Sequence, residues 1–535
     1  MLTLTEKLER MKLWLEYEGG YCNNILECRS EIKAECQFFS KRRKIDLERG
    51  LHAKNDIPPK ETLMVISRHC IITEEMGKNL PIGRKIESSG MKLNSSKHVF
   101  LVLFLLWDRK NHGVKSFFYP YYDLLPQSFC NIPLYWTPEE MKFLEGSFLI
   151  AEINRRIKGI AEDYSAICEI APEMEKVCSL QEFQWAYTVV ITRNFGVELN
   201  NGVWTSALVP QADMLNHRRP PQAEWKYDLE RDAFTVTTLE NIPAGSQIYQ
   251  SYGKKSNHRY LLSYGFSVED NIEEDGTCPN QVSIEIDLSW ADPEFPDKAA
   301  FWIADGYFDS DDESSMSYVF PPHESLQAEH FQAHCVGVGD MGASTFDVFR
   351  SSKNDEKYRV SMDFCKSLNV RIADDENTKL LFSFLRTIVC NRDEIAFLNR
   401  MSMTCDDILK PIRLRNELTA MKLLKEIIVD HLARYPTTIQ DDIENLMDKQ
   451  AYPPNSNRRN AKIQVKGEKE VLCHFLLWAQ SSILVLEAIQ CDRKNACLNE
   501  YNLSCHENFS AAMEELYEAE VHWTILNHCK NVLND

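Results

Sequence analysis

Hydrophobic positions recur with helical spacing at the start of the chain. Leucines and a methionine give residues 1–19 a broad apolar face, and a Gly-Gly pair ends this segment. The pattern then changes, because residues 51–67 contain strand-like stretches on either side of a Pro-Pro turn. The first part of the chain therefore predicts a helix followed by a β-arch.

Helical periodicity returns over residues 68–190, including a stretch at 97–107 that we expect to be buried and a helix at 180–192. Short strands resume after this block. They are WTSALVP (204–210), AEWKYDLERDAFTVTTL (223–239), GSQIYQSYG (245–253) and NQVSIEIDL (280–288). A helical block between two groups of short strands indicates an α+β domain rather than a βαβ repeat.

The second half of the chain has a different pattern of residues. Residues 305–375 contain the acidic run DSDDESS (309–315) and the Gly-rich GVGDMGAS (337–344), which predict mobile loops peripheral to the chemistry. Long amphipathic helices then dominate, which predicts an all-α domain. The predicted divisions are an N-terminal helical segment (1–44), an α+β domain (45–290) with a helical insertion (68–190), an extension (291–375) and a helical domain (376–535).

Composition and charge narrow the classes of function. A chain of 535 residues is too long for one hydrophobic core, and 44% apolar with 26% charged residues is typical of globular proteins. The 60 Lys and Arg against 80 Asp and Glu give a net charge of −20. This charge argues against nucleic acid as the primary ligand and favours basic partners such as lysine-rich protein segments.

The 17 cysteines are spread singly, and the N-terminal segment reads as an amphipathic helix rather than a cleavable leader. We therefore expect a reducing compartment, the cytosol or the nucleus. The KRRK at 41–44 fits either a nuclear-import signal or a solvated loop. The apolar runs at 99–107 and 471–489 are too short or too polar to span a membrane, so we expect buried helices. CxxC pairs and GxxxxGK[ST] phosphate loops are missing from the sequence, which argues against metal and nucleotide-phosphate chemistry.

The candidate chemistry lies between residues 203 and 266. ADMLNH (212–217) is followed by IYQSYGKKSNHRYLLSYGF (248–266). An Asn-His pair is followed by Tyr249, Tyr252 and Tyr264 in short strand-like segments separated by glycines. These residues can line a polar cleft that has an aromatic wall. The same residues also fit an ordinary hydrogen-bonded core, and their spacing alone does not separate these interpretations.

The pairing of PxADMxNH with YGxKSNxxxLxxYGF resembles the two signature blocks of SET-domain methyltransferases, in the class of the Rubisco large-subunit lysine methyltransferase and the actin-histidine methyltransferase. Five further blocks match in order: RGLHAKNDIPP (49–59), FFYPYYDLLPQ (117–127), FQWAYTVVITRNFG (183–196), ARYPTTIQDD (433–442) and VKGEKEVL (465–472). The resemblance implies an α+β SET domain with short sheets and a pseudoknot, followed by the class's helical substrate-binding domain.

The resemblance also implies S-adenosylmethionine (AdoMet) as methyl donor. It further implies a narrow channel through which the target side chain reaches the methyl group of AdoMet from the opposite face of the domain. Tyr252 matches the catalytic tyrosine, whose hydroxyl would orient the target or take its proton, and orientation requires no further pKa shift. Asp213 is more typical of a buried structural carboxylate. The positions matching cofactor-binding residues are Gly50, His52, Arg193, Asn216, His217, Tyr252, Tyr264 and Phe266.

One position departs from the family pattern. The arch usually reads G-x-G, whereas here Glu48 stands at the first glycine position and only Gly50 remains. A side chain therefore stands where backbone normally approaches the cofactor. Either the Glu48 side chain turns outward, or the loop is shifted and cofactor affinity is reduced. The intact NH and YGF blocks favour the first interpretation.

Two positions bear on the target side chain. Relatives that methylate histidine have Asn at the position of Phe195 and Trp at that of Ala212. Here Phe195 offers an apolar face that attracts a cation, and the small Ala212 leaves room for the extended methylene chain of a lysine. Tyr264 completes the substrate pocket. The resemblance thus implies a protein-lysine N-methyltransferase whose C-terminal helices bind the protein substrate. The alternatives are a protein-histidine N-methyltransferase of the actin type and a catalytically weak SET-fold binding module.

Overall fold

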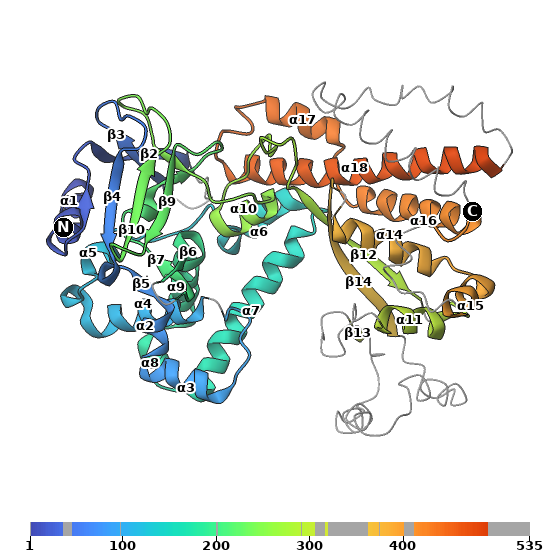
Figure 1. Ribbon diagram of the computed structural model, residues 1–535, viewed down its shortest axis with the longest axis horizontal. Helices are drawn as coiled ribbons and strands as arrows, with labels where there is room; N and C mark the ends of the chain where they lie inside the picture. The colour runs from blue at the N-terminus through green and yellow to red at the C-terminus, as the bar shows by residue number, and fades with distance from the viewer. Residues whose placement is uncertain are drawn as a thin grey trace. The chain divides into compact units, whose positions relative to one another are not determined.

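The computed structural model describes residues 2–35, 45–96, 98–199, 202–289, 291–304, 316–318, 362–373, 375–400 and 411–490 (Figure 1). The chain divides into two units, Met1–Asn280 with Thr437–Gly467, and Gln281–Pro436 with Glu468–Asp535. The KRRK, acidic and Gly-rich segments noted in the sequence lie outside the described residues. The first unit contains both signature blocks.

The N-terminal helix α1 spans Leu4–Tyr17. It begins with a capping box, in which Thr3 and Glu6 exchange side-chain and backbone hydrogen bonds. The remainder of the predicted helical segment differs from the prediction, because β1 (Tyr21–Cys22) and β2 (Leu26–Glu35) are strands. These strands pair with β4 and β3 and complete sheets whose other members come later in the chain, so the local sequence alone does not specify them.

Short antiparallel sheets form the β part of the first unit. Their strand orders are β1-β4-β10-β9, β2-β3 and β5-β7-β6. The predicted β-arch is present, and the sheets β1-β4-β10-β9 and β5-β7-β6 combine segments distant in sequence, whereas β2 and β3 are consecutive strands. The remaining members are β3 (Ile45–Ala53), β4 (Thr62–Ser67), β5 (Ile72–Thr73), β6 (Asn194–Glu198), β7 (Trp204–Leu208), β9 (Ala223–Asp228) and β10 (Ala233–Thr238).

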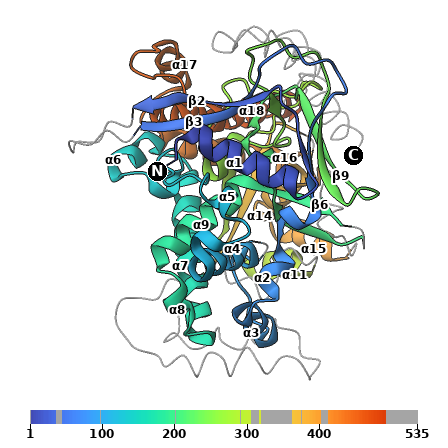
Figure 2. The same ribbon diagram turned by 90° about the vertical axis from the view of Figure 1, so that its left-hand side faces the viewer.

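The predicted helical insertion separates these strands. Its apolar run forms α4 (Val99–His112), in which residues 99–106 are all buried, as expected for a helix covered on every side. Figure 2 shows α4, α7, α8 and α9 in one group, and α9 packs on both α4 and α7. The helices are α2 (Glu74–Lys78), α3 (Pro81–Ser89), α5 (Tyr119–Tyr122), α6 (Pro138–Met141), α7 (Leu149–Ile170), α8 (Met174–Val177) and α9 (Leu180–Arg193).

The second unit contains the predicted C-terminal helices but is not all-α. β12 (Gln281–Leu288) alternates buried and less buried residues and pairs with β14 (Met362–Arg371), which also pairs with β13 (Met316–Tyr318). β13 and β14 lie in the segment predicted to be mobile loop. The prediction was wrong for these residues, because β14 gains its order by pairing with β12, about 80 residues earlier in sequence.

The helices after β12 are α11 (Phe295–Ala304), α14 (Glu376–Ile388), α15 (Arg392–Arg400), α16 (Leu414–Ala433), α17 (Ile439–Met447) and α18 (Asn457–Gln490). α17 and the beginning of α18 belong to the first unit, where Arg459 of α18 contacts Glu269 at 2.6 Å. Helices able to cross a membrane are not found among the described residues.

Candidate active site

Two very short parallel strands bring the signature blocks together in the first unit. β8 (Asn216–His217) pairs with β11 (Tyr249–Gln250), so that Asn216 lies opposite Tyr249 and His217 opposite Gln250. The Gln250 side chain donates to the carbonyl of Leu215 at 3.2 Å. Segments separated by more than 30 residues therefore lie side by side, as the pseudoknot implied by the sequence requires.

A cavity of about 1220 Å³ opens beside this crossing. Its wall combines the N-terminal part of α1, residues 122–132, the end of α9 and the two signature blocks. This first cavity is lined by six of the eight predicted cofactor-binding residues: Arg193, Asn216, His217, Tyr252, Tyr264 and Phe266.

Asn216 is held by hydrogen bonds on its amide nitrogen. Nδ2 donates to Oε1 of Gln247 at 2.7 Å and to the carbonyl of Arg49 at 3.2 Å. Gly50 makes this arrangement fit, because a Cβ at residue 50 would lie 2.5 Å from Gln247 Oε1 and 3.0 Å from Asn216 Nδ2. Gly50 therefore supports the site through close backbone packing rather than by lining the first cavity.

His52 also lies away from both cavities. It is buried, and its Nδ1 lies 3.2 Å from the carbonyl oxygen of Gly50. His52 pairs with Gln247 across an isolated β-bridge. The side chain of Glu48 is outside the described residues, whereas its backbone lies in β3 opposite Glu31. The structure thus gives the arch residues a supporting position behind Asn216.

His217 sits within a group of aromatic rings. Its ring centroid lies 4.9 Å from that of Tyr260, 5.3 Å from Tyr252 and 5.8 Å from Phe266. Its Nδ1 accepts a hydrogen bond from the Tyr252 backbone N–H at 3.0 Å. Burial, with the nearby charges of Arg219 and Lys255, lowers the pKa of His217 to about 4. The imidazole is therefore neutral at pH 7 and holds the Tyr252 backbone as an acceptor.

Arg193 and Asp213 form a buried ion pair between the cavities. Arg193 Nη1 donates to Asp213 Oδ2 at 3.0 Å and to the Asp213 carbonyl at 3.1 Å, and the Tyr121 hydroxyl donates to the same carboxylate at 2.8 Å. Burial opposes the charge of Arg193, but Asp213 and Tyr121 raise its pKa above the usual value. Asp213 is therefore a structural partner of Arg193, the more typical of the roles expected from sequence.

Tyr252, Tyr264 and Phe266 are positioned around helix α10 (Asn257–Tyr264). Gly265 ends this helix in the left-handed conformation, with φ of 77°, and a Cβ there would lie 2.3 Å from Asn131 Nδ2. The Tyr252 and Tyr264 ring centroids are 4.8 Å apart. The Tyr252 hydroxyl donates to the carbonyl of Leu215 at 3.0 Å. This turn places two tyrosine rings, tilted by 32° to each other, beside the crossing.

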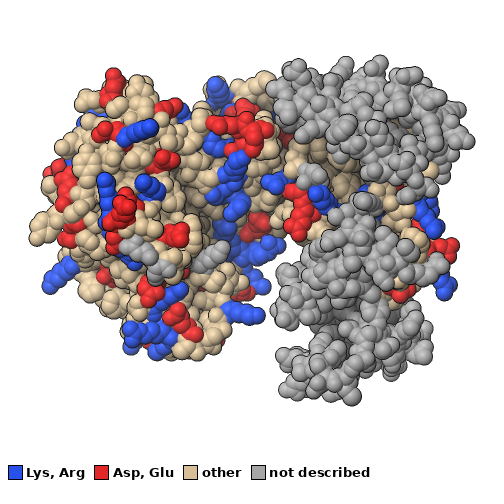
Figure 3. Space-filling view, viewed as in Figure 1, with Lys and Arg blue, Asp and Glu red and all other residues tan. Residues whose placement is uncertain are grey.

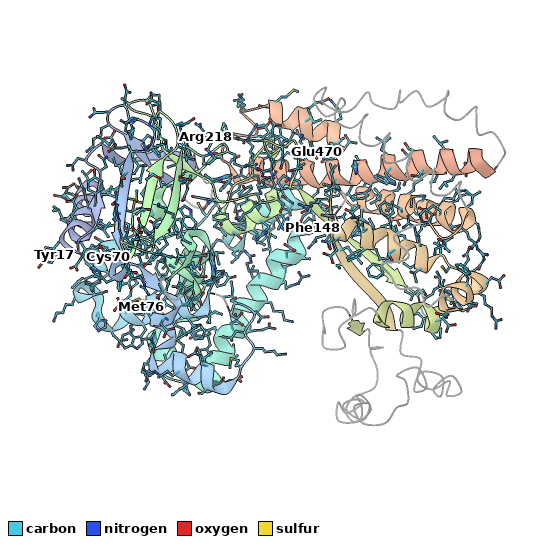
Figure 4. All side chains as sticks on the ribbon, in the orientation of Figure 1. Tyr17, Cys70, Met76, Phe148, Arg218 and Glu470 are labelled. Carbon is cyan, nitrogen blue, oxygen red and sulfur yellow. The ribbon has the colours of Figure 1, made fainter. Side chains whose placement is uncertain are left out.

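A second cavity, of about 680 Å³, has α7, α9, β6 and α10 in its wall. It shares a common wall with the first cavity, made of Thr192, Arg193, Asp213, Tyr252 and Tyr264. Phe148, labelled in Figure 4, stands just before α7 with its ring centroid 5.4 Å from that of the cavity residue His258. Burial, with Arg259 and Arg156, lowers the pKa of His258 to about 3. Each cavity therefore contains a neutral histidine.

The two residues predicted to select the target have different positions. Phe195 lines the second cavity, with its ring centroid 5.4 Å from that of Trp225 and 5.1 Å from that of Phe234. Ala212 is 1% exposed and lines neither cavity. Phe195 thus faces the second cavity, whereas the buried Ala212 faces neither cavity.

Sequence reasoning missed three residues: Gln247, Arg156 and Arg259. Gln247 fixes Asn216, and its only signal is its place two residues before Tyr249. Arg156 and Arg259 line the second cavity from α7 and α10. Nothing in the local sequence distinguishes these arginines from ordinary surface residues, because the cavity they share exists only in the folded chain.

Two family models match the chain. One, described as the SET domain, matches residues 48–253, and the other, described as Rubisco LSMT substrate-binding, matches residues 346–472. Among curated proteins, the actin-histidine N-methyltransferase of Homo sapiens is 27% identical over 311 residues, covering 56% of this chain and 50% of that protein. The Danio rerio protein of the same name is 28% identical over 285 residues, covering 51% of this chain and 47% of that protein. The chain thus spans about half the length of the curated relatives it matches.

Solved structures agree with the fold. The SET domain of LSMT bound to lysine and AdoHcy aligns with a TM-score of 0.63 at 19% identity, covering 96% of this chain and 100% of that one. Rubisco LSMT bound to AdoMet aligns with a TM-score of 0.61 at 20% identity, with the same coverage. The predicted SET fold is confirmed. The chain thus combines a SET domain, at residues 48–253, with a Rubisco LSMT substrate-binding domain, at residues 346–472.

Proposed function

We propose that this chain is an AdoMet-dependent protein methyltransferase that modifies a lysine side chain. The common wall of the two cavities is the observation that carries the proposal. Methyl transfer from a sulfonium is an in-line displacement, so donor and acceptor approach one carbon atom from opposite sides. Two cavities that meet at Tyr252 and Tyr264 suit such an approach.

The residues of the first cavity fit AdoMet. Arg193 Nε is buried and finds no acceptor among the described residues, so it can donate to the cofactor's carboxylate. Asn216 Nδ2 is occupied by protein acceptors, which leaves its oxygen to accept from the cofactor. The rings of Tyr252, Tyr264 and Phe266 offer their faces to a positively charged sulfur. When bound, AdoMet supplies the electrophilic methyl group.

The second cavity favours a neutral amine. A lysine with a reference pKa near 10.4 costs about 4.6 kcal/mol to deprotonate at pH 7 unless its surroundings lower that pKa. A lysine that already lines this cavity, Lys255, has a lowered pKa, because it is buried and lies near the charge of Arg259. A target lysine entering the same space would meet the same desolvation and the same positive charge.

Tyr252 is placed to orient the target nitrogen. Because its hydroxyl hydrogen is donated to Leu215, the oxygen keeps lone pairs that can accept a hydrogen bond from an incoming amine. Burial raises the pKa of the neighbouring Tyr264, so that phenol is neutral at pH 7. We infer that the amine loses its proton to solvent before transfer, and that its nitrogen then gains the methyl carbon as the carbon–sulfur bond breaks.

Lysine is favoured over histidine by the wall of the second cavity. Phe195, Trp225 and Phe234 form an apolar cluster that suits the methylene stem of a lysine. Protein-histidine methylation is the second candidate, because the matched curated relatives are named actin-histidine N-methyltransferases. The polar group that the family places at residue 195 in such enzymes is replaced here by Phe195.

Mass spectrometry of a cell lysate treated with the purified chain and isotope-labelled AdoMet tests the proposal. We expect label on lysine in at least one protein, and loss of that label with Tyr252→Phe. Tyr227→Phe is a matched control, because Tyr227 donates to Asp232 at 2.6 Å and lines neither cavity. Label confined to histidine would select the second candidate, and no label on any protein would refute methyltransferase activity.

A further inference from the structure

The second cavity is positively charged although the whole chain carries a net charge of −20. Its charged lining consists of Glu152, Arg156, Arg193, Asp213, Lys255 and Arg259. Arg193 and Asp213 neutralise each other in their buried ion pair. Three cations, Arg156, Lys255 and Arg259, then face one carboxylate, that of Glu152.

Among the described residues, none of these three cations forms an ion pair with a carboxylate, and the single charge of Glu152 offsets only one of the three. Arg156 donates to the Leu262 carbonyl and the Ser263 hydroxyl at 3.3 Å, and Lys255 Nζ contacts the Tyr252 carbonyl. Each of these acceptors is uncharged, so the positive charges remain. Arg259 is exposed on α10.

The effect of this charge is visible on the cavity's own titratable groups. Arg259 contributes to lowering the pKa of both Lys255 and His258, after the larger effect of burial. Burial raises the pKa of Glu152, whereas the charges of Arg155, Arg156 and Arg259 lower it, so Glu152 interacts with two of the three cations. Figure 3 shows Lys and Arg side chains gathered over α7, the helix that supplies Arg156. Positive charge is therefore present both in the lining of the cavity and on the surface of α7.

We propose that the second cavity selects target segments in which an Asp or Glu flanks the methylated residue. This inference rests on the proposed function and adds a substrate class to it. The net charge of the chain favours basic partners, but electrostatic attraction falls off over about 8 Å in physiological salt, so the local cations decide at the opening. A carboxylate beside the target can reach Arg259 or Arg156, whereas a flanking Lys or Arg would be repelled.

Paired fluorescent peptides test this inference on the full chain saturated with AdoHcy. The peptides carry one lysine and differ only in whether its neighbours are Glu, Gln or Arg, and fluorescence anisotropy measures the dissociation constants. We expect the Glu peptide to bind about 5-fold more tightly than the Gln peptide at low salt, with the advantage shrinking in high salt. The Arg peptide should bind most weakly.

Variants identify the source of the preference. Arg259→Gln should reduce the advantage of the Glu peptide, and Arg259→Glu should reverse it in favour of the Arg peptide. Lys158→Gln is the matched control: Lys158 lies on α7, is 78% exposed beside Glu162 and lines neither cavity, so its loss should leave the preference unchanged.

Equal binding of the three peptides, or a preference that Arg259→Glu leaves unchanged, would overturn the inference. Because binding is measured without methyl transfer, this result is distinct from failure of the proposed function. An enzyme that methylates lysates but shows no acidic preference would retain the function and lose only the substrate class.

Discussion

The two cavities share five wall residues but differ in what completes them. The first is completed by Leu2 and by Leu4 and Lys7 of α1, whereas the second is completed by cationic residues of α7 and α10 and by the aromatic cluster around Phe195. The common wall comes almost entirely from the recognisable sequence blocks. The residues of the common wall can therefore be recognised from local sequence, whereas selectivity on each side depends on helices from elsewhere in the chain.

Replacing Tyr252 with Phe tests the common wall and should have the largest effect on activity. Loss of the hydroxyl that orients the target should reduce turnover about 10²-fold, while AdoMet affinity stays within about twofold because the ring is retained. Steady-state kinetics and calorimetric titration measure the two quantities. Near-normal turnover would remove Tyr252 from the reacting centre.

Acidification should destabilise both sides of the wall, because each cavity contains a histidine whose pKa is lowered on folding. The unfolded chain binds protons below pH 6.5, whereas folded His217 does so only near pH 4. Stability from His217 is therefore fully present above pH 6.5 and is lost as the pH falls toward 4. The loss should be about 2 kcal/mol between pH 7 and pH 5.

Thermal unfolding at pH 7 and pH 5 checks this expectation. His217→Asn keeps an acceptor near Nδ1 but removes the titrating group, so its melting temperature should fall less on acidification than that of the parent chain. His69→Asn is the control, since His69 is exposed. Identical pH dependence in the parent and in His217→Asn would contradict a neutral, buried His217.

Asn216→Ala should affect the first cavity alone. The change removes the amide and leaves Gln247 Oε1 without its 2.7 Å donor. We expect AdoMet affinity to fall about tenfold, or roughly 1.4 kcal/mol, while peptide binding at the second cavity is unchanged. Calorimetry with each ligand separates the two, and equal AdoMet affinity in variant and parent would exclude Asn216 from the cofactor site.

Phe195→Asn should produce the smallest change, on the second cavity alone. A polar amide in the aromatic wall favours an imidazole over a methylene stem, so the ratio of kcat/KM for lysine and histidine peptides should shift several-fold toward histidine. Phe195→Leu is the apolar control and should keep the lysine preference. An unchanged ratio in Phe195→Asn would show that this wall does not select the target.

The α+β class, the helical insertion, the β-arch and the crossing of the NH and YGF blocks could be predicted from sequence. The positions of three residues relative to the cavities could not be predicted from sequence: Gly50, His52 and Ala212. Each matches a family position, yet each lies behind a cavity wall, because motif spacing does not reveal which neighbours face the cavity. A Trp in place of buried Ala212 would therefore disturb packing before it could narrow a channel.

The boundary predicted near residue 290 also differs from the structure. Thr437–Gly467 returns to the first unit, where Asn460 accepts from the Ser267 N–H at 3.1 Å and Arg459 pairs with Glu269. Such long-range contacts carry no local sequence signal. A chain shortened at residue 290 would lose part of the first unit along with the second.

Simultaneous binding is the most direct test of two cavities that meet at one wall. Titration of a lysine peptide, prepared with Glu neighbours, into the full chain with and without saturating AdoHcy measures whether the two ligands occupy separate spaces. We predict that the peptide binds the AdoHcy-saturated chain at least as tightly as the free chain. Mutual exclusion, in which AdoHcy displaces the peptide, would contradict the assignment of donor and acceptor to opposite sides of Tyr252 and Tyr264.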